Sequence, residues 1–155
     1  MSRHWAAVLA LALTPAAAVA QPPAMDREAL HKAMQGRWQA DKRKVAESDP
    51  EWKTRSAEQR KLLLELMPEM SFEFTATRLT LLAEGGDEAR HFDYKVVGAK
   101  DRTLRLRGRA PDETQDEEIN VEVVDEHTLR MTRDSDQTVF WLQRVKPASP
   151  PPSPR

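Results

Sequence analysis

Three histidines follow residue 20 of this chain, and none has the spacing of a metal site. His31 lies in a helical pattern, His91 alternates with apolar residues, and His127 falls in a polar turn. Zinc needs several ligands at short fixed spacings such as H-x-x-x-H. The chain has no cysteine, which excludes thiolate ligands, cysteine nucleophiles and disulfides. We therefore expect no metal and no cofactor.

Carboxylates crowd one segment, residues 112–118 (DETQDEE). A catalytic carboxylate pair needs two buried groups whose pKa values are pushed apart, and a polar loop does not bury them. The segment also lacks the D-x-D-x-D-G order of a calcium loop. No G-x-S-x-G, P-loop or dinucleotide-binding fingerprint occurs. The sequence therefore predicts no catalytic residue and favours a protein that is not an enzyme.

The fold that would position these residues is indicated by the hydrophobicity of the chain, which alternates with a period of two residues from Met70 onward. Apolar and polar residues alternate in short stretches separated by turn residues, which is typical of antiparallel strands with one buried face. The stretches lie near 37–40, 70–75, 78–81, 91–96, 104–107, 119–123, 129–132 and 138–145. Closing eight such strands in meander order into a barrel removes both exposed edges. We therefore predict a mainly β fold, an eight-stranded antiparallel meander barrel.

Two helical segments accompany the strands. Asp26 can N-cap a short helix that ends at Gly36. A second helix is predicted from Pro50 to Met67, between the first and second strands, with Ser56 and Gln59 as a capping box. Since its apolar stripe must be buried against another part of the protein, we expect this helix to cover the open end of the barrel, either as the lid of a ligand site or as a plug. The stripe consists of Leu62, Leu63, Leu66 and Met67.

The two ends of the chain differ from the barrel segment, 21–146. Residues 1–20 combine Arg3, an apolar run over 5–13 and an A-x-A site before Gln21, which is typical of a cleavable signal peptide. We therefore expect an exported protein, periplasmic or secreted. The run is too short to span a bilayer, so no stable membrane anchor is expected. A net charge of −1 favours neither nucleic acid nor anionic lipid. The Pro-rich segment 147–155 is expected to be disordered.

One constellation resembles a known family. Gly36-Arg37-Trp38 precedes the first predicted strand, and Arg144 lies near the end of the last one. This arrangement resembles the lipocalin-like (calycin) small β-barrel proteins, here of the bacterial envelope. The resemblance implies that Trp38 packs against Arg144 and closes one end of the barrel. A guanidinium stacked on an indole is worth about 0.5–2 kcal/mol.

The barrel interior carries the functional expectation. An eight-stranded barrel is just wide enough to be filled by side chains or to hold one small ligand, and the sequence leaves both open. The leading hypothesis is an exported, non-catalytic protein that binds a small apolar ligand or lipid. The alternative is an envelope interaction or structural protein that has a filled barrel and acts through its outer surface on an unidentified protein partner. The candidate ligand-binding residues point inward: Phe72, Phe74, Leu81, Phe92, Tyr94, Leu106 and Met131.

Overall fold

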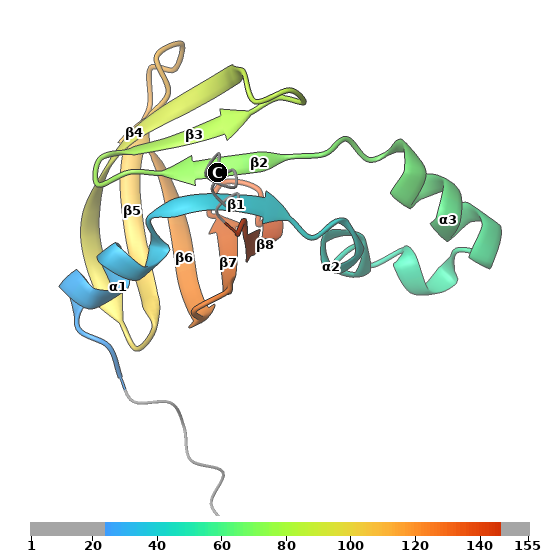
Figure 1. The fold of residues 1–155 in the computed structure, drawn as a ribbon, viewed down its shortest axis with the longest axis horizontal. Helices are drawn as coiled ribbons and strands as arrows, with labels where there is room; N and C mark the ends of the chain where they lie inside the picture. Colours follow the sequence, from blue (N-terminus) through green and yellow to red (C-terminus); the bar gives the residue numbers. More distant parts are fainter. Residues whose placement is uncertain (1–23, 147–155) are drawn as a thin grey trace, which may run out of the picture.

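The computed structural model describes residues 24–146, which form a closed eight-stranded antiparallel barrel with strands in meander order (Figure 1). The predicted fold class is confirmed. The elements are α1 (Arg27–Met34), β1 (Gly36–Ala40), α2 (Lys42–Glu47), the 3-10 helix η1 (Trp52–Thr54), α3 (Ala57–Leu66), β2 (Ser71–Phe74), β3 (Arg78–Leu82), β4 (Glu88–Lys100), β5 (Thr103–Arg109), β6 (Glu117–Asp125), β7 (Thr128–Arg133) and β8 (Val139–Arg144).

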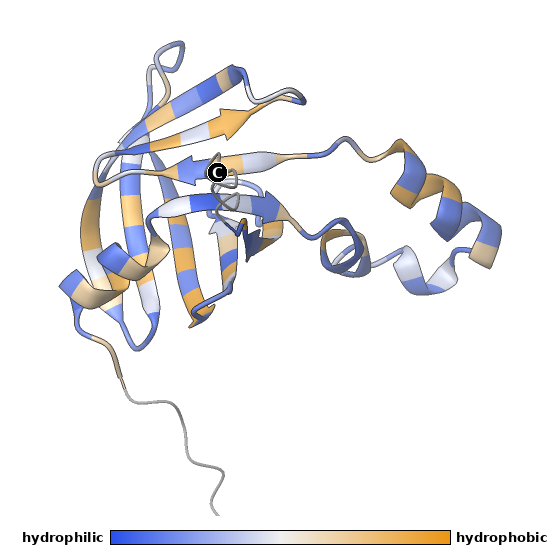
Figure 2. Cartoon of the chain, in the orientation of Figure 1, coloured by the Kyte–Doolittle hydropathy of each residue, from blue (hydrophilic) through white to orange (hydrophobic). Residues whose placement is uncertain are grey.

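Hydrophobic and hydrophilic residues alternate along the strands (Figure 2), and the burial of the apolar ones shows that this alternation sorts side chains between the barrel interior and the solvent. On β6, Ile119, Val121 and Val123 are buried, and the residues between them are half-buried. β4 runs past the predicted stretch 91–96 to Lys100, through an irregularity between Val96 and Gly98. Such bulges bend and twist a strand, which helps a sheet to close on itself.

The helix α1 closes one end of the barrel, and Arg144 holds it there. The guanidinium of Arg144 lies 4.2 Å from the ring centroid of the buried Trp38. Its three nitrogens donate to the carbonyl oxygens of Gln35, Ala33 and Glu126, at 3.1, 2.6 and 2.9 Å. The contact implied by the family resemblance is therefore present. We call this end of the barrel the closed end.

Gly36 makes this close approach possible. Its φ of +118° is a backbone conformation that side chains rarely adopt, and a Cβ there would meet Nη1 of Arg144 at 3.0 Å. The residue therefore ends α1, turns the chain into β1 and leaves room for the arginine.

The chain between β1 and β2 forms a projecting arm, residues 41–69, rather than one long helix (Figure 1). The predicted helix between the first and second strands is confirmed, but it is shorter than Pro50 to Met67, because only Ala57–Leu66 is α-helical and the chain before it forms α2 and η1. The capping box of Ser56 and Gln59 is present. The expected cover over the barrel is absent: Leu62 and Leu66 are 55% and 71% exposed. The arm thus leaves the opposite end of the barrel uncovered, and we call that end the mouth.

The arm is mounted on the outside of β8. The backbone N–H of Asp41 donates to the carbonyl oxygen of Trp141 at 2.7 Å, and Ala46 of α2 is buried. The Nζ of Lys44 lies 4.9 Å from the Trp141 ring centroid. Trp141 thus lies beneath α2 on the outer face, since its neighbours Phe140 and Leu142 have the inward phase.

The predicted signal peptide, 1–20, and the Pro-rich tail, 147–155, lie outside the described residues. Among residues 24–146, no helix is long and apolar enough to cross a membrane.

Candidate binding site at the barrel mouth

An apolar hollow of about 180 Å3 opens at the mouth of the barrel. Its floor and walls come from the ends of six strands, from Met70 just before β2 and from Ala110 just after β5. The lining consists of Met70, Phe72, Leu79, Leu81, Arg90, His91, Phe92, Ala110, Glu117, Ile119, Met131, Arg133 and Phe140. The rings of Phe72 and Phe140 pack 5.7 Å apart within it. The interior is therefore filled at the closed end and hollow at the mouth.

The structure divides the seven candidate ligand-binding residues between these two regions. Phe72, Leu81, Phe92 and Met131 line the hollow. The other three lie outside it, in the packed core, where Phe74 and Leu106 are 2% and 0% exposed.

Tyr94, the third candidate residue that lies in the packed core, places a hydroxyl group inside the barrel. Its hydroxyl donates to the carbonyl oxygen of Thr75 and lies 3.3 Å from Nε2 of His31. Burial raises the pKa of Tyr94, so its phenol stays protonated and keeps this hydrogen bond. The residue therefore ties α1 to the turn between β2 and β3 instead of facing the hollow.

Three charged residues form a collar around the hollow, and the sequence analysis did not single them out. Arg90, Glu117 and Arg133 line it, and each lies two residues from a buried inward residue of its own strand: Phe92, Ile119 and Met131. They share the inward phase because side chains alternate along a strand. Continuing the alternation by one step past the last apolar residue would have identified them.

Each residue of the collar takes part in an ion pair. Arg133 donates through Nε to Oε1 of Glu117 at 2.7 Å, and this carboxylate also accepts from the hydroxyl of Ser135 at 2.9 Å. The hydrogen bond to Glu117 raises the pKa of Arg133. Arg90 pairs with Glu113. The collar thus holds its charges as ion pairs at the rim, above an apolar floor.

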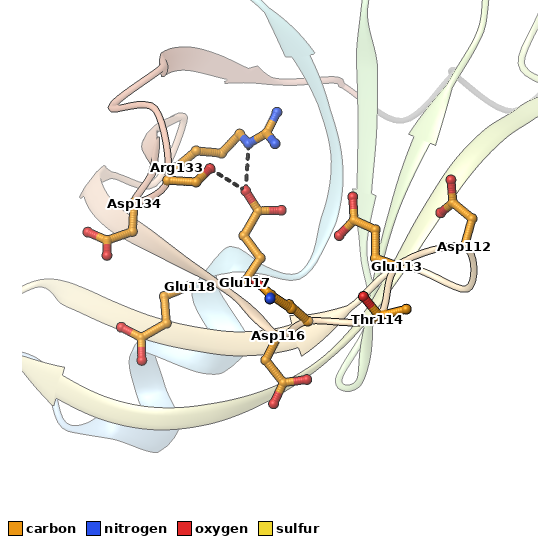
Figure 3. Close-up of a pocket in the computed structure, with 10 residues that line it drawn as sticks. Asp112, Glu113, Thr114, Asp116, Glu117, Glu118, Arg133 and Asp134 are labelled. Atoms are coloured by element: carbon orange, nitrogen blue, oxygen red, sulfur yellow. Dashed lines mark hydrogen bonds and ion pairs between the residues drawn. The ribbon is translucent and has the colours of Figure 1, made fainter.

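The acidic segment 112–118 borders a second, more open depression, which shares Glu117 and Arg133 with the hollow (Figure 3). Its carboxylates spread apart, and several are paired: Glu118 with Arg107, and Asp116 with Arg109 at 2.8 Å. Within residues 24–146, no group of three or more His, Cys, Asp or Glu side chains could hold a metal ion. The acidic segment therefore forms cross-strand ion pairs.

The other two histidines lie near carboxylates. Nδ1 of His91 contacts Glu88 at the rim of the mouth, and Nε2 of the exposed His127 lies 3.0 Å from Glu126. Nε2 of His91 also lies 4.0 Å from Asp93. These are surface contacts with carboxylates and not metal-ligand clusters.

In comparisons with known proteins, no family model matches the chain, and no curated protein or solved structure matches it significantly.

Proposed function

We propose that this chain is an exported, non-catalytic binding protein that holds a small apolar ligand, or one end of a lipid, in the hollow at the barrel mouth. The observation that carries the proposal is the uncovered apolar hollow of about 180 Å3. The Trp38–Arg144 closure supports it, since it resembles that of lipocalin-like barrels.

The size of the hollow limits what enters it. An apolar cavity of about 150 Å3 accepts benzene, whereas pockets that enclose drug-sized ligands measure about 300–1,000 Å3. The hollow here therefore has room for one aromatic ring or a short alkyl segment. A longer lipid would leave most of its length outside, beyond the collar.

A binding role fits the lining better than a catalytic one. The lining includes one carboxylate, Glu117, and Arg133 holds it in an ion pair. General acid–base chemistry by carboxylates needs two groups with separated pKa values. The remaining groups of the lining are mostly alkyl and aromatic, which favours burial of an apolar group.

Titration with straight-chain alcohols tests the proposal. Butanol, hexanol, octanol and decanol would be added to 15N-labelled protein, with amide shifts followed by NMR. We expect shifts to centre on Phe92, Ile119 and Met131, and affinity to stop rising once the chain exceeds the hollow. A matched pair of variants gives the control: Ala110→Leu fills the hollow and abolishes binding, whereas Ala99→Leu on the exposed part of β4 does not. Shifts scattered over the surface, or equal binding by both variants, would contradict the proposal.

Export is tested independently. The pattern of residues 1–20 leads us to propose a mature chain that begins at Gln21 and resides in the periplasm or outside the cell. N-terminal sequencing of the protein recovered from each cell fraction checks this, and a product retaining Met1 outside the cytoplasm would contradict it.

A second candidate function is favoured by one observation, the exposure of Leu62 and Leu66 on the arm. Exposed leucines at adjacent turns of a helix are typical of a protein-contact surface. On this alternative the protein acts through its outer surface, and filling the hollow with Ala110→Leu leaves its activity unchanged.

A further inference from the structure

Two methionine side chains line the hollow at different depths. Met70 and Met131 both belong to its lining. Met131 is only 3% exposed, whereas Met70 is half-buried and lies at the uncovered mouth, just before β2. A small solute that enters the mouth therefore meets Met70 before it meets Met131.

The backbone and the strand pattern hold Met70 in this position. Its carbonyl oxygen accepts a hydrogen bond from the backbone N–H of Ala40 at 2.8 Å. Met70 shares the inward phase of the buried Phe72 and Phe74, because side chains alternate along a strand. It also packs against the hydrophobic core. The side chain is thus part of the wall of the hollow.

Methionine thioethers are the only sulfur groups of the chain, because it has no cysteine. Exposure controls how readily an oxidant reaches a methionine sulfur. Among residues 24–146, Met34 is fully buried at the closed end, whereas Met67 is half-buried on the arm and does not line the hollow. Met34 and Met67 therefore provide two internal references, one shielded from solvent and one accessible but outside the hollow.

We propose that Met70 is a reversible oxidation site through which peroxides control the apolar character of the hollow. In the reaction, the thioether sulfur attacks one oxygen of hydrogen peroxide, and the O–O bond breaks. The sulfur gains that oxygen and loses two electrons, while the proton of the transferred oxygen passes to the other oxygen, which leaves as water. The product, methionine sulfoxide, is polar, and methionine sulfoxide reductases return it to methionine with a thiol as reductant.

Oxidation of Met70 changes what the hollow can hold. The sulfoxide places an oxygen in a hollow of about 180 Å3 whose lining is mostly alkyl and aromatic. A polar oxygen buried against an apolar ligand without a hydrogen bond is unfavourable, so the affinity for such a ligand falls. Conversely, a bound ligand covers Met70 and slows its oxidation, since each event disfavours the other. The effect on binding rests on the proposed function, whereas the oxidation site itself does not.

A peroxide time course followed by mass spectrometry tests which residue is oxidised. The protein would be treated with hydrogen peroxide and digested after glutamate, which separates Met67 from Met70 because Glu69 lies between them. Met70 should be oxidised at least about tenfold faster than Met34 and Met131. Saturating octanol should slow the oxidation of Met70 and leave that of Met67 unchanged. Oxidation of Met70 no faster than that of Met34 would overturn the proposal.

Two leucine variants test the consequence for binding, because leucine replaces methionine at similar volume and has no sulfur. Octanol affinity would be measured by NMR before and after peroxide for the wild type, Met70→Leu and the matched control Met67→Leu, with circular dichroism to check folding. Peroxide should lower the affinity about tenfold in the wild type and in Met67→Leu, and should not change it in Met70→Leu. Treatment of the oxidised wild type with methionine sulfoxide reductase should restore the affinity. A loss of affinity in all three proteins, or in none, would overturn the proposal.

The octanol measurements separate this inference from the proposed function. Octanol that binds the untreated protein but leaves the oxidation of Met70 unchanged supports the proposed function and overturns the control by Met70. If octanol does not bind the untreated protein, the proposed function is contradicted. The rate of Met70 against that of Met34 then decides the oxidation site by itself: a faster Met70 supports the site, and equal rates overturn it.

Discussion

Replacement of Arg144 and Trp38, singly and together, tests how the closed end is held. Trp38 is fully buried, and its Nε1 donates to the carbonyl oxygen of Met34 at 2.8 Å. Truncating a buried tryptophan to alanine costs about 3–5 kcal/mol. Trp38→Ala should therefore lower the free energy of unfolding by that amount.

Arg144→Ala should cost less, about 2–3 kcal/mol. The change removes three hydrogen bonds from a charged group and one cation–π contact. Hydrogen bonds to charged groups contribute about 1.5–3 kcal/mol each. The side chain is only partly buried, so water replaces some of them at the freed carbonyls.

The two changes should not be additive, because the guanidinium lies 4.2 Å from the indole ring. Removing the ring eliminates the cation–π contact but leaves the three carbonyl bonds of Arg144, so the coupling energy should equal the cation–π part, about 0.5–2 kcal/mol. Urea unfolding followed by far-UV circular dichroism gives all four free energies.

Two controls sharpen the cycle. Arg144→Lys keeps the charge but cannot reach three carbonyls, so it should lose much of the stability. Arg37→Ala lies on the neighbouring strand in an exposed pair with Glu73 and should cost less than about 1 kcal/mol. A coupling energy of zero, or an Arg144→Lys protein as stable as wild type, would refute the reasoning.

Three further predictions concern the barrel wall. Gly108→Ala should prevent folding or lower the free energy of unfolding by more than about 3 kcal/mol, because a Cβ there would lie 1.9 Å from the carbonyl oxygen of Asp93. The control is Gly85→Ala, where a Cβ would meet nothing within 4 Å but φ is +93°. It should cost about 1 kcal/mol, measured for both variants by thermal melting. Hydrogen bonds from Arg78 lower the pKa of Asp93 below its ordinary 3.8. The pair therefore stabilises the fold above pH 3.8, and its contribution is lost as the pH falls through the folded-state pKa. Asp93→Asn should make stability fall less steeply with acid, and an unchanged acid dependence would contradict this. Tyr94→Phe removes a buried hydrogen bond and should cost about 1 kcal/mol in urea unfolding.

The strand pattern was readable from sequence because side chains alternate along every strand and one face must be buried. That constraint is local and repeated, so the inward residues of β6 follow from it. The meander order was predicted from the short turns between the strands and from the removal of both exposed edges on closure. The capping box at Ser56 is equally local, since Gln59 is only three residues away. Trp38 and Arg144 are far apart in sequence, and their contact was expected only through the resemblance to closed barrels.

Tertiary structure alone decided where the arm points and where the barrel is hollow. The spacing of Leu62 and Leu66 shows that α3 has an apolar face, but what a helix packs on depends on its anchors, here Arg60 and the docking of α2 beside Trp141. The hollow exists because α1 fills the closed end with Leu30 and Met34, whereas the arm leaves the mouth uncovered. The residue pattern of a single strand carries no information about a volume that six strands enclose together. The sequence therefore determined which side chains face inward, and the three-dimensional arrangement determined how much space they leave.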